Sequence, residues 1–148
     1  MLQPSWRRFV SPASLLVVGV AFGYGFHVVE DAHAASAKHR VYELRTYTTN
    51  PGKLDALNAR FRDNTLRLFV KHHMKSVAYW MPQDPPLAGT TLTYVISHDS
   101  REAAENNWKE FIADPEVKAV MSKSEENGKI VTKVERVFMD PTDYSPLK

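Results

Sequence analysis

Strand-type and helix-type segments alternate in a fixed order from residue 41 onward, and this order constrains the fold more than any other feature of the sequence. β-branched and aromatic residues dominate four short runs, at residues 41–47, 76–81, 91–97 and 130–139. Between these runs, apolar residues recur every three or four positions over residues 51–71, 99–113 and 115–127. Such patterns are typical of strands and of amphipathic helices, respectively. The order strand–helix–strand–strand–helix–helix–strand predicts an α+β domain with a four-stranded antiparallel sheet and helices on one face.

Capping residues indicate where the helices begin. Asn50 is a favourable N-cap, and Pro51 suits the first helical position. Asp99, with Glu102 three residues later, fits a capping box for the second helix. The dipeptide at 114–115, Asp-Pro, is expected to end that helix and to start a third.

Alternation along the strands assigns the side chains to two faces of the sheet. In the first strand, one face receives Val41, Glu43, Arg45 and Tyr47, and the other receives Tyr42, Leu44 and Thr46. The helices are expected to cover one face only, yet both faces carry large side chains. An uncovered apolar face needs a partner, and the simplest partner is a second copy under two-fold symmetry. The sequence therefore predicts a homodimer that is formed through the helix-free face.

The first residues resemble a targeting segment. Two arginines at positions 7 and 8 precede the uncharged run 15–26, and small residues at 32–37 offer Ala-x-Ala-type cleavage sites. Residues 1–37 are interpreted as a signal peptide, which predicts export to the periplasm or the cell exterior. An uncleaved membrane anchor over the apolar run 10–29 stays an alternative, and so does a mitochondrial transit peptide. The remaining residues, 38–148, form the single predicted domain.

Composition excludes several classes of protein. The 19 Lys and Arg residues are interleaved with 17 Asp and Glu residues, so the net charge of +2 does not predict a nucleic-acid surface. The chain has no cysteine, which rules out disulfides and thiolate chemistry. No phosphate-binding loop, dinucleotide fingerprint, HExxH or G-x-S-x-G motif is present. We therefore expect no metal site and no cofactor.

Several motifs resemble the NIPSNAP family in their order and spacing. They are Tyr42-Glu43-Leu44-Arg45-Thr46-Tyr47, Pro51-Gly52-Lys53-Leu54, Val77-Ala78-Tyr79-Trp80, Trp108 with Phe111, Asp114-Pro115, and Thr142-Asp143-Tyr144-Ser145-Pro146. The resemblance implies a ferredoxin-like fold that dimerises through its sheets into an α/β barrel. Relatives of that fold include cofactor-independent monooxygenases and haem-degrading enzymes. This chain departs from the animal members of the family in two ways: it has an apolar N-terminal segment, and it has a single domain.

A charged group on the first strand is the first candidate for a binding site. Glu43 and Arg45 share one face, and Arg136 is a possible partner for them. Placed in the cleft between two sheets, such a pair either orients a ligand or forms a structural ion-pair network.

Histidine and aromatic residues supply the other candidates. His72 ends the apolar stripe of the first helix, where it either reaches a pocket edge or interacts with the helix terminus. Trp80 and Tyr94 offer aromatic surface to a pocket, whereas Trp108 is expected in the core. His98 is expected in a surface turn.

Two functions from different classes follow from these features. The first is an exported homodimer that binds a small apolar or amphipathic molecule, or a protein, in its inter-sheet cleft. The second is a cofactor-independent monooxygenase or a haem-type enzyme of the same barrel fold. The fold is compatible with both, because fold alone does not determine function.

Overall fold

A computed structural model describes residues 40–148, and the predicted targeting segment lies outside these residues. The strands are β1 (Val41–Thr49), β2 (Lys75–Trp80), β3 (Thr91–His98) and β4 (Val131–Met139). The helices are α1 (Leu54–Arg60), the π-helical turn η1 (Phe61–Thr65), α2 (Leu66–Lys71), α3 (Arg101–Ala113) and α4 (Pro115–Ser124). Within the described part of the chain, no helix has the length and apolar character needed to cross a bilayer.

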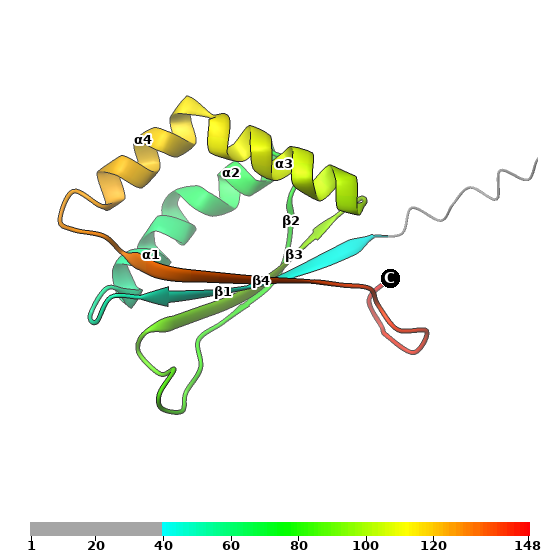
Figure 1. Cartoon of the computed structure of the whole chain (residues 1–148), viewed down its shortest axis with the longest axis horizontal. Helices are drawn as coiled ribbons and strands as arrows, with labels where there is room; N and C mark the ends of the chain where they lie inside the picture. The colour runs from blue at the N-terminus through cyan, green and yellow to red at the C-terminus, as the bar shows by residue number, and fades with distance from the viewer. Residues whose placement is uncertain (1–39) are drawn as a thin grey trace, which may run out of the picture. The chain divides into compact units, whose positions relative to one another are not determined.

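The sheet has the order β2-β3-β1-β4, and every pair of neighbours is antiparallel. All helices lie on one side of the sheet, as Figure 1 shows with the helices above the strands. This arrangement confirms the predicted α+β, ferredoxin-like architecture. We refer to the opposite side of the sheet as the helix-free face.

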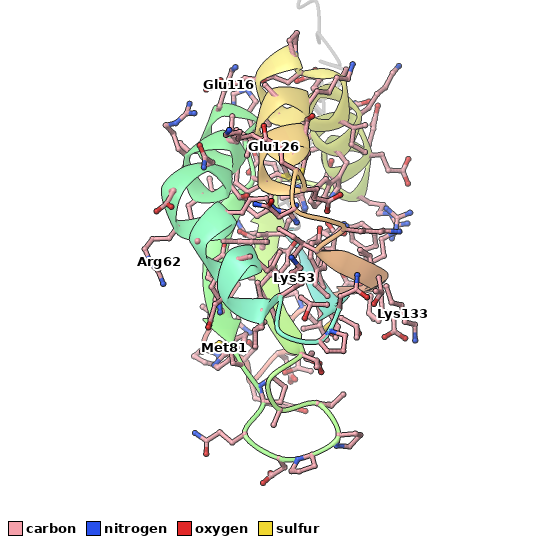
Figure 2. All side chains as sticks on the ribbon, turned by 90° about the vertical axis from the view of Figure 1, so that its left-hand side faces the viewer. Lys53, Arg62, Met81, Glu116, Glu126 and Lys133 are labelled. Carbon is pink, nitrogen blue, oxygen red and sulfur yellow. The ribbon has the colours of Figure 1, made fainter. Side chains whose placement is uncertain are left out.

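The core fills the space between the sheet and the helices. It is rich in aromatic side chains that meet edge to face, such as Phe61 with Tyr94 and Phe69 with Trp108. Charged side chains such as Arg62 and Glu116 lie on the outer side of the helical layer (Figure 2). The apolar stripe predicted for residues 51–71 therefore packs on the sheet, although η1 widens the helix in its middle.

Two of the three predicted helix starts are wrong. The Asn50 side chain does not cap α1 but donates to the carbonyl of Lys129 at 2.8 Å. A turn with Gly52 at a φ of 73° reverses the chain first, so that α1 begins only at Leu54. Ser100, and not Asp99, caps α3, because α3 begins one residue later than the sequence suggests.

The third predicted start and the end of α2 follow known capping rules. Asp114 Oδ1 accepts a hydrogen bond from the Glu116 N–H at 2.8 Å, which confirms the predicted cap of α4. At the end of α2, the N–H of Met74 donates to the carbonyl oxygen of Phe69, and the N–H of His73 donates to that of Val70. These two bonds form a Schellman motif. His73 occupies the left-handed position of this motif with a φ of 58°.

Candidate functional site

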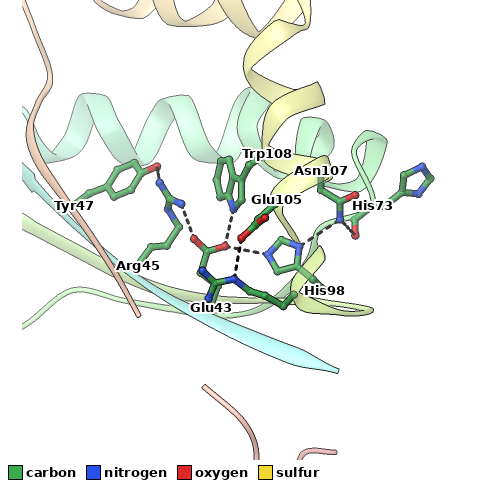
Figure 3. A network of polar contacts seen from close by, with 9 residues as sticks. Glu43, Arg45, Tyr47, His73, His98, Glu105, Asn107 and Trp108 are labelled. Atoms are coloured by element: carbon green, nitrogen blue, oxygen red, sulfur yellow. Dashed lines mark hydrogen bonds and ion pairs between the residues drawn. The ribbon is translucent and has the colours of Figure 1, made fainter. Parts of the chain in front are cut away.

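A buried polar cluster connects β1, the end of β3 and α3 (Figure 3). We define the Glu43 cluster as Glu43, Arg45, His98, Asn107 and Trp108. Strand alternation places Glu43 and Arg45 on the helix-facing side, while α3 carries Asn107 and Trp108 down onto them. The side chains of Glu43 and His98 are inaccessible to solvent.

The Glu43 carboxylate accepts three hydrogen bonds. Arg45 Nη1 donates to Oε1 at 2.7 Å, Trp108 Nε1 donates to Oε2 at 2.6 Å, and His98 Nε2 lies 3.0 Å from Oε2. Burial would raise the pKa of the Glu43 carboxyl, but the hydrogen bonds from His98 and Trp108 and the charge of Arg45 hold it below its ordinary value. Glu43 is therefore an anion that the surrounding donors satisfy.

The Arg45 guanidinium is held from several sides. Its Nη2 donates to Tyr47 Oη at 3.3 Å, and its central carbon lies 4.0 Å from the centre of the Trp108 ring. Burial would lower the pKa of Arg45, but the nearby tyrosine hydroxyls and the Glu43 carboxylate raise it above its ordinary value. The ion pair is thus enclosed by aromatic rings, where attraction between opposite charges is strong.

His98 is not a surface residue, so the prediction of a turn position is wrong. It is the last residue of β3, and α3 folds back over it, so that it is 1% exposed. Asn107 Nδ2 lies 3.3 Å from His98 Nδ1 and the same distance from the carbonyl oxygen of His73. An amide NH₂ only donates, so His98 is assigned as the neutral tautomer that carries its proton on Nε2 and donates to Glu43.

The Glu43 cluster does not lie between two sheets. The prediction that Glu43 and Arg45 face an inter-sheet cleft is wrong, because both side chains point at α3. Arg136 pairs with Arg45 across the strands, but its exposed side chain lies by Phe138 rather than by Glu43. Of the two interpretations of this pair, the contacts support the structural ion-pair network.

His72 lies at the end of α2, where α4 begins nearby. Its Nε2 lies 2.8 Å from Asp114 Oδ2, and Lys71 Nζ lies 2.7 Å from the same oxygen. Hydrogen bonds from Lys71 and His72 hold the pKa of Asp114 well below its ordinary value. His72 therefore ties the end of α2 to the start of α4, and its side chain bonds to Asp114 rather than to Glu43.

Tyr94 and Trp80 lie on opposite sides of the sheet. Tyr94 is fully buried beneath the helices, between the rings of Phe61 and Phe69, and burial raises its pKa well above the ordinary value. Trp80 is 53% exposed and lies on the helix-free face. The helix-free face also carries a hollow. Of the six candidate residues from the sequence, Trp80 alone lines this hollow.

A hollow of about 320 Å³ opens on the helix-free face. The strands contribute Tyr42, Val77, Trp80, Val95 and Met139, and the segment after β4 contributes Asp140, Pro141, Thr142, Ser145 and Leu147. Most of the lining is apolar. Because the hollow is partly open to solvent and large enough for a small organic molecule, it is the better candidate for a binding site.

Sequence reasoning missed most of this lining. Strand alternation does place Tyr42 and Val95 on the face of the sheet that Glu43 does not occupy, so this part of the lining could be predicted. A bulge between Ser76 and Ala78 shifts the register of β2, which period-two counting does not reveal. Residues 140–148 show no periodic pattern, and nothing local in them shows that they fold against the sheet.

Residues 40–148 contain no cluster of three or more His, Cys, Asp or Glu side chains arranged to hold a metal ion.

Comparisons with known proteins agree with the fold. A family model described as NIPSNAP matches residues 42–146. A NIPSNAP family protein of unknown function from Agrobacterium tumefaciens is 20% identical, with a TM-score of 0.64 over 75% of this chain and 96% of that chain. An uncharacterised NIPSNAP-like domain protein from Burkholderia xenovorans is 16% identical, with a TM-score of 0.64 over 74% of this chain and 90% of that chain.

A monooxygenase also shares the fold. The enzyme from Streptomyces coelicolor, solved in complex with nanaomycin D, is 17% identical, with a TM-score of 0.51 over 75% of this chain and 95% of that chain. At this identity the likeness shows the fold alone. A search of curated proteins gave no match.

Proposed function

The chain belongs to the NIPSNAP family, and we propose that it is an exported homodimer that binds a small apolar or amphipathic molecule between its two sheets. The hollow on the helix-free face carries this proposal. Trp80 and Tyr42 form aromatic walls there, and Val95 forms part of the floor. Burial of such surfaces by an apolar ligand is favourable at about 25 cal/mol per Å².

The exposed part of the helix-free face supports the dimer. Trp80 and Val137 are 53% and 56% exposed, and Leu147 is 49% exposed. Helices cover the other face of the sheet, so these side chains stay in contact with water in a monomer. A second copy that packs on this face removes them from water and closes the hollow.

Export is proposed from the sequence of residues 1–37. Paired arginines, an uncharged apolar run and Ala-x-Ala sites follow each other in the order of a signal peptide. The absence of cysteine in the chain is compatible with an oxidising compartment.

The oxygenase alternative receives less support from the site. A general base needs a titratable side chain within reach of the substrate. Among the described residues that line the hollow, Asp140 is the only carboxylate and there is no histidine. The buried Glu43 and His98 belong to the opposite side of the sheet and are already paired with each other.

Two variants of β4 test the dimer. Val137→Arg places a charge on the helix-free face, whereas Val134→Arg places the same charge on the helix side of the same strand, at a similar exposure. Analytical ultracentrifugation should show a dimer for the wild type and for Val134→Arg, and a monomer for Val137→Arg. A monomeric wild type at micromolar concentration would refute the homodimer.

Ligand binding is tested with N-phenyl-1-naphthylamine, an uncharged probe that fluoresces in apolar sites. The wild type should bind it saturably, and Trp80→Ala should weaken binding about tenfold, which corresponds to about 1.4 kcal/mol. Ile112→Ala is the matched control, because Ile112 is a 65% exposed apolar residue on α3. Equal effects of the two variants would argue against the hollow as the site.

A further inference from the structure

The segment after β4, residues 140–148, folds back against the helix-free face, and we call it the strap. In Figure 1 it loops below the end of β4, on the side opposite the helices. It has no regular secondary structure, yet it supplies one wall of the hollow through Pro141, Thr142, Ser145 and Leu147. The hollow is therefore built from two parts, the sheet and an irregular strap.

Several hydrogen bonds join residues of the strap to one another. Lys148 Nζ donates to the carbonyl oxygens of Thr142 and Asp143, each at 2.7 Å. The N–H of Ser145 donates to the Thr142 carbonyl at 3.1 Å, and the N–H of Leu147 donates to Ser145 Oγ at 3.2 Å. These bonds persist when the strap moves as a unit, because both partners of each bond belong to it.

A hydrogen bond joins the far part of the strap to the sheet. Tyr42 Oη donates to the main-chain oxygen of Lys148 at 3.0 Å, and these residues are 106 positions apart in the chain. A single part-buried hydrogen bond contributes only modestly to the net free energy, because water can replace either partner. Leu147 packs at the hollow but is 49% exposed, so its burial adds only partly to the attachment.

The charges around the hollow indicate the kind of ligand. Asp140 is a carboxylate at the wall, and no lysine, arginine or histidine is among the described lining residues. The ammonium group of Lys148 is occupied by the two strap carbonyls. An anionic ligand would meet a carboxylate and no cationic side chain in the lining, whereas an uncharged ligand loses no charge hydration on entry.

We propose that the strap is the movable wall of the ligand site, and that an uncharged apolar molecule enters when the Tyr42–Lys148 hydrogen bond opens. This inference rests on the proposed function. The bound molecule lies between Trp80 and Tyr42 on the sheet and Pro141 and Leu147 on the strap. The strap lies where β1 begins and β4 ends, so the ligand would enter from the edge of the helix-free face.

The experiment compares two strap contacts with a matched control. Leu147→Ala removes a wall residue, and Tyr42→Phe removes the fastening hydroxyl but keeps the ring. Tyr144→Ala is the control, because Tyr144 belongs to the strap but is 84% exposed and does not line the hollow. Binding of N-phenyl-1-naphthylamine is measured by equilibrium titration and by stopped-flow fluorescence on the purified chain.

We expect Leu147→Ala to raise the Kd several-fold and Tyr42→Phe to raise the dissociation rate several-fold, with Tyr144→Ala unchanged. The anionic analogue 8-anilinonaphthalene-1-sulfonate should bind at least about tenfold more weakly than the uncharged probe. Normal binding constants and rates in both Leu147→Ala and Tyr42→Phe would overturn the movable wall. Equal affinity for the two probes would overturn the preference for an uncharged ligand.

Hydrogen–deuterium exchange separates this inference from the proposed function, because it needs no ligand. The strap amides should exchange faster than those of β1, and Tyr42→Phe should accelerate the strap amides alone. Exchange in the strap that is as slow as in β1 would overturn the movable wall. Failure of the wild type to bind the probe, with a fast-exchanging strap, would instead count against the proposed function.

Discussion

Replacement of Glu43 by glutamine removes one negative charge from the centre of the Glu43 cluster without a change of shape. The substituted amide has one NH₂ group, and each oxygen of Glu43 now faces a donor: Arg45 on one side, Trp108 and His98 on the other. Whichever way the glutamine amide turns, its NH₂ group faces an N–H donor of a neighbouring side chain instead of an acceptor. Arg45 meanwhile stays 9% exposed and loses its carboxylate. Removal of one partner from a buried ion pair costs about 3–5 kcal/mol, and we expect this loss of unfolding free energy.

Urea unfolding followed by circular dichroism measures this loss, with all variants at one protein concentration. The pKa of Glu43 is lowered in the folded chain from an ordinary value of 4.5. A lowered carboxyl pKa stabilises the fold above the unfolded-state value, and this stabilisation disappears as the pH falls through the folded-state pKa. The difference in unfolding free energy between the wild type and Glu43→Gln should therefore be largest at neutral pH and should shrink below about pH 4.5.

Glu105→Gln is the matched control, because Glu105 pairs with Arg101 on the surface of α3 and its side chain is 62% exposed. We expect that change to cost at most about 0.5 kcal/mol. The double variant Glu43→Gln/Arg45→Met should be more stable than Glu43→Gln alone, because no unpaired charge stays buried. A Glu43→Gln variant within about 0.5 kcal/mol of the wild type would refute the requirement for a buried carboxylate.

Two further predictions concern the end of α2 and the N-terminal segment. His73→Gly should stabilise the domain by about 0.5–1 kcal/mol, because glycine adopts the left-handed φ of 58° without steric cost; a loss of stability in thermal unfolding would contradict this reasoning. In a host with a general secretion system, the exported protein should begin at Ala35 or Lys38, as N-terminal sequencing would show. Recovery of the uncleaved chain in the membrane fraction would support the anchor instead.

Periodicity alone predicted the order of the elements in this chain. The alternation in residues 41–47 and the three- and four-residue spacing in residues 51–71 are local properties, so they predict a strand and a helix without knowledge of the fold. The family resemblance then gave the ferredoxin-like topology, which the strand order confirms. Periodicity did not fix the first residue of each helix, since Asn50 and Asp99 compete with Lys53 and Ser100 for the cap positions.

The tertiary structure decided the roles of the candidate site residues. Alternation places Glu43 and Tyr42 on opposite faces of the sheet. It does not show which face is covered by the helices. The partners of Glu43 come from the end of β3 and from α3, 55 and 65 residues away, and no local pattern shows that His98 and Trp108 meet it. Arg136 was a plausible partner by charge, yet the helix-facing space at Glu43 is filled by Trp108.

The hollow depends on the same kind of long-range contact. Trp80 and Tyr42 belong to strands that the sequence predicts, but the strap that completes the hollow is a polar segment with no periodicity. Its place is set by the Tyr42 hydroxyl and by the end of β4, which direct the chain back over the sheet. Sequence predicts an element when the pattern that specifies it is local, whereas a wall built from segments 106 residues apart exists only once the sheet has formed.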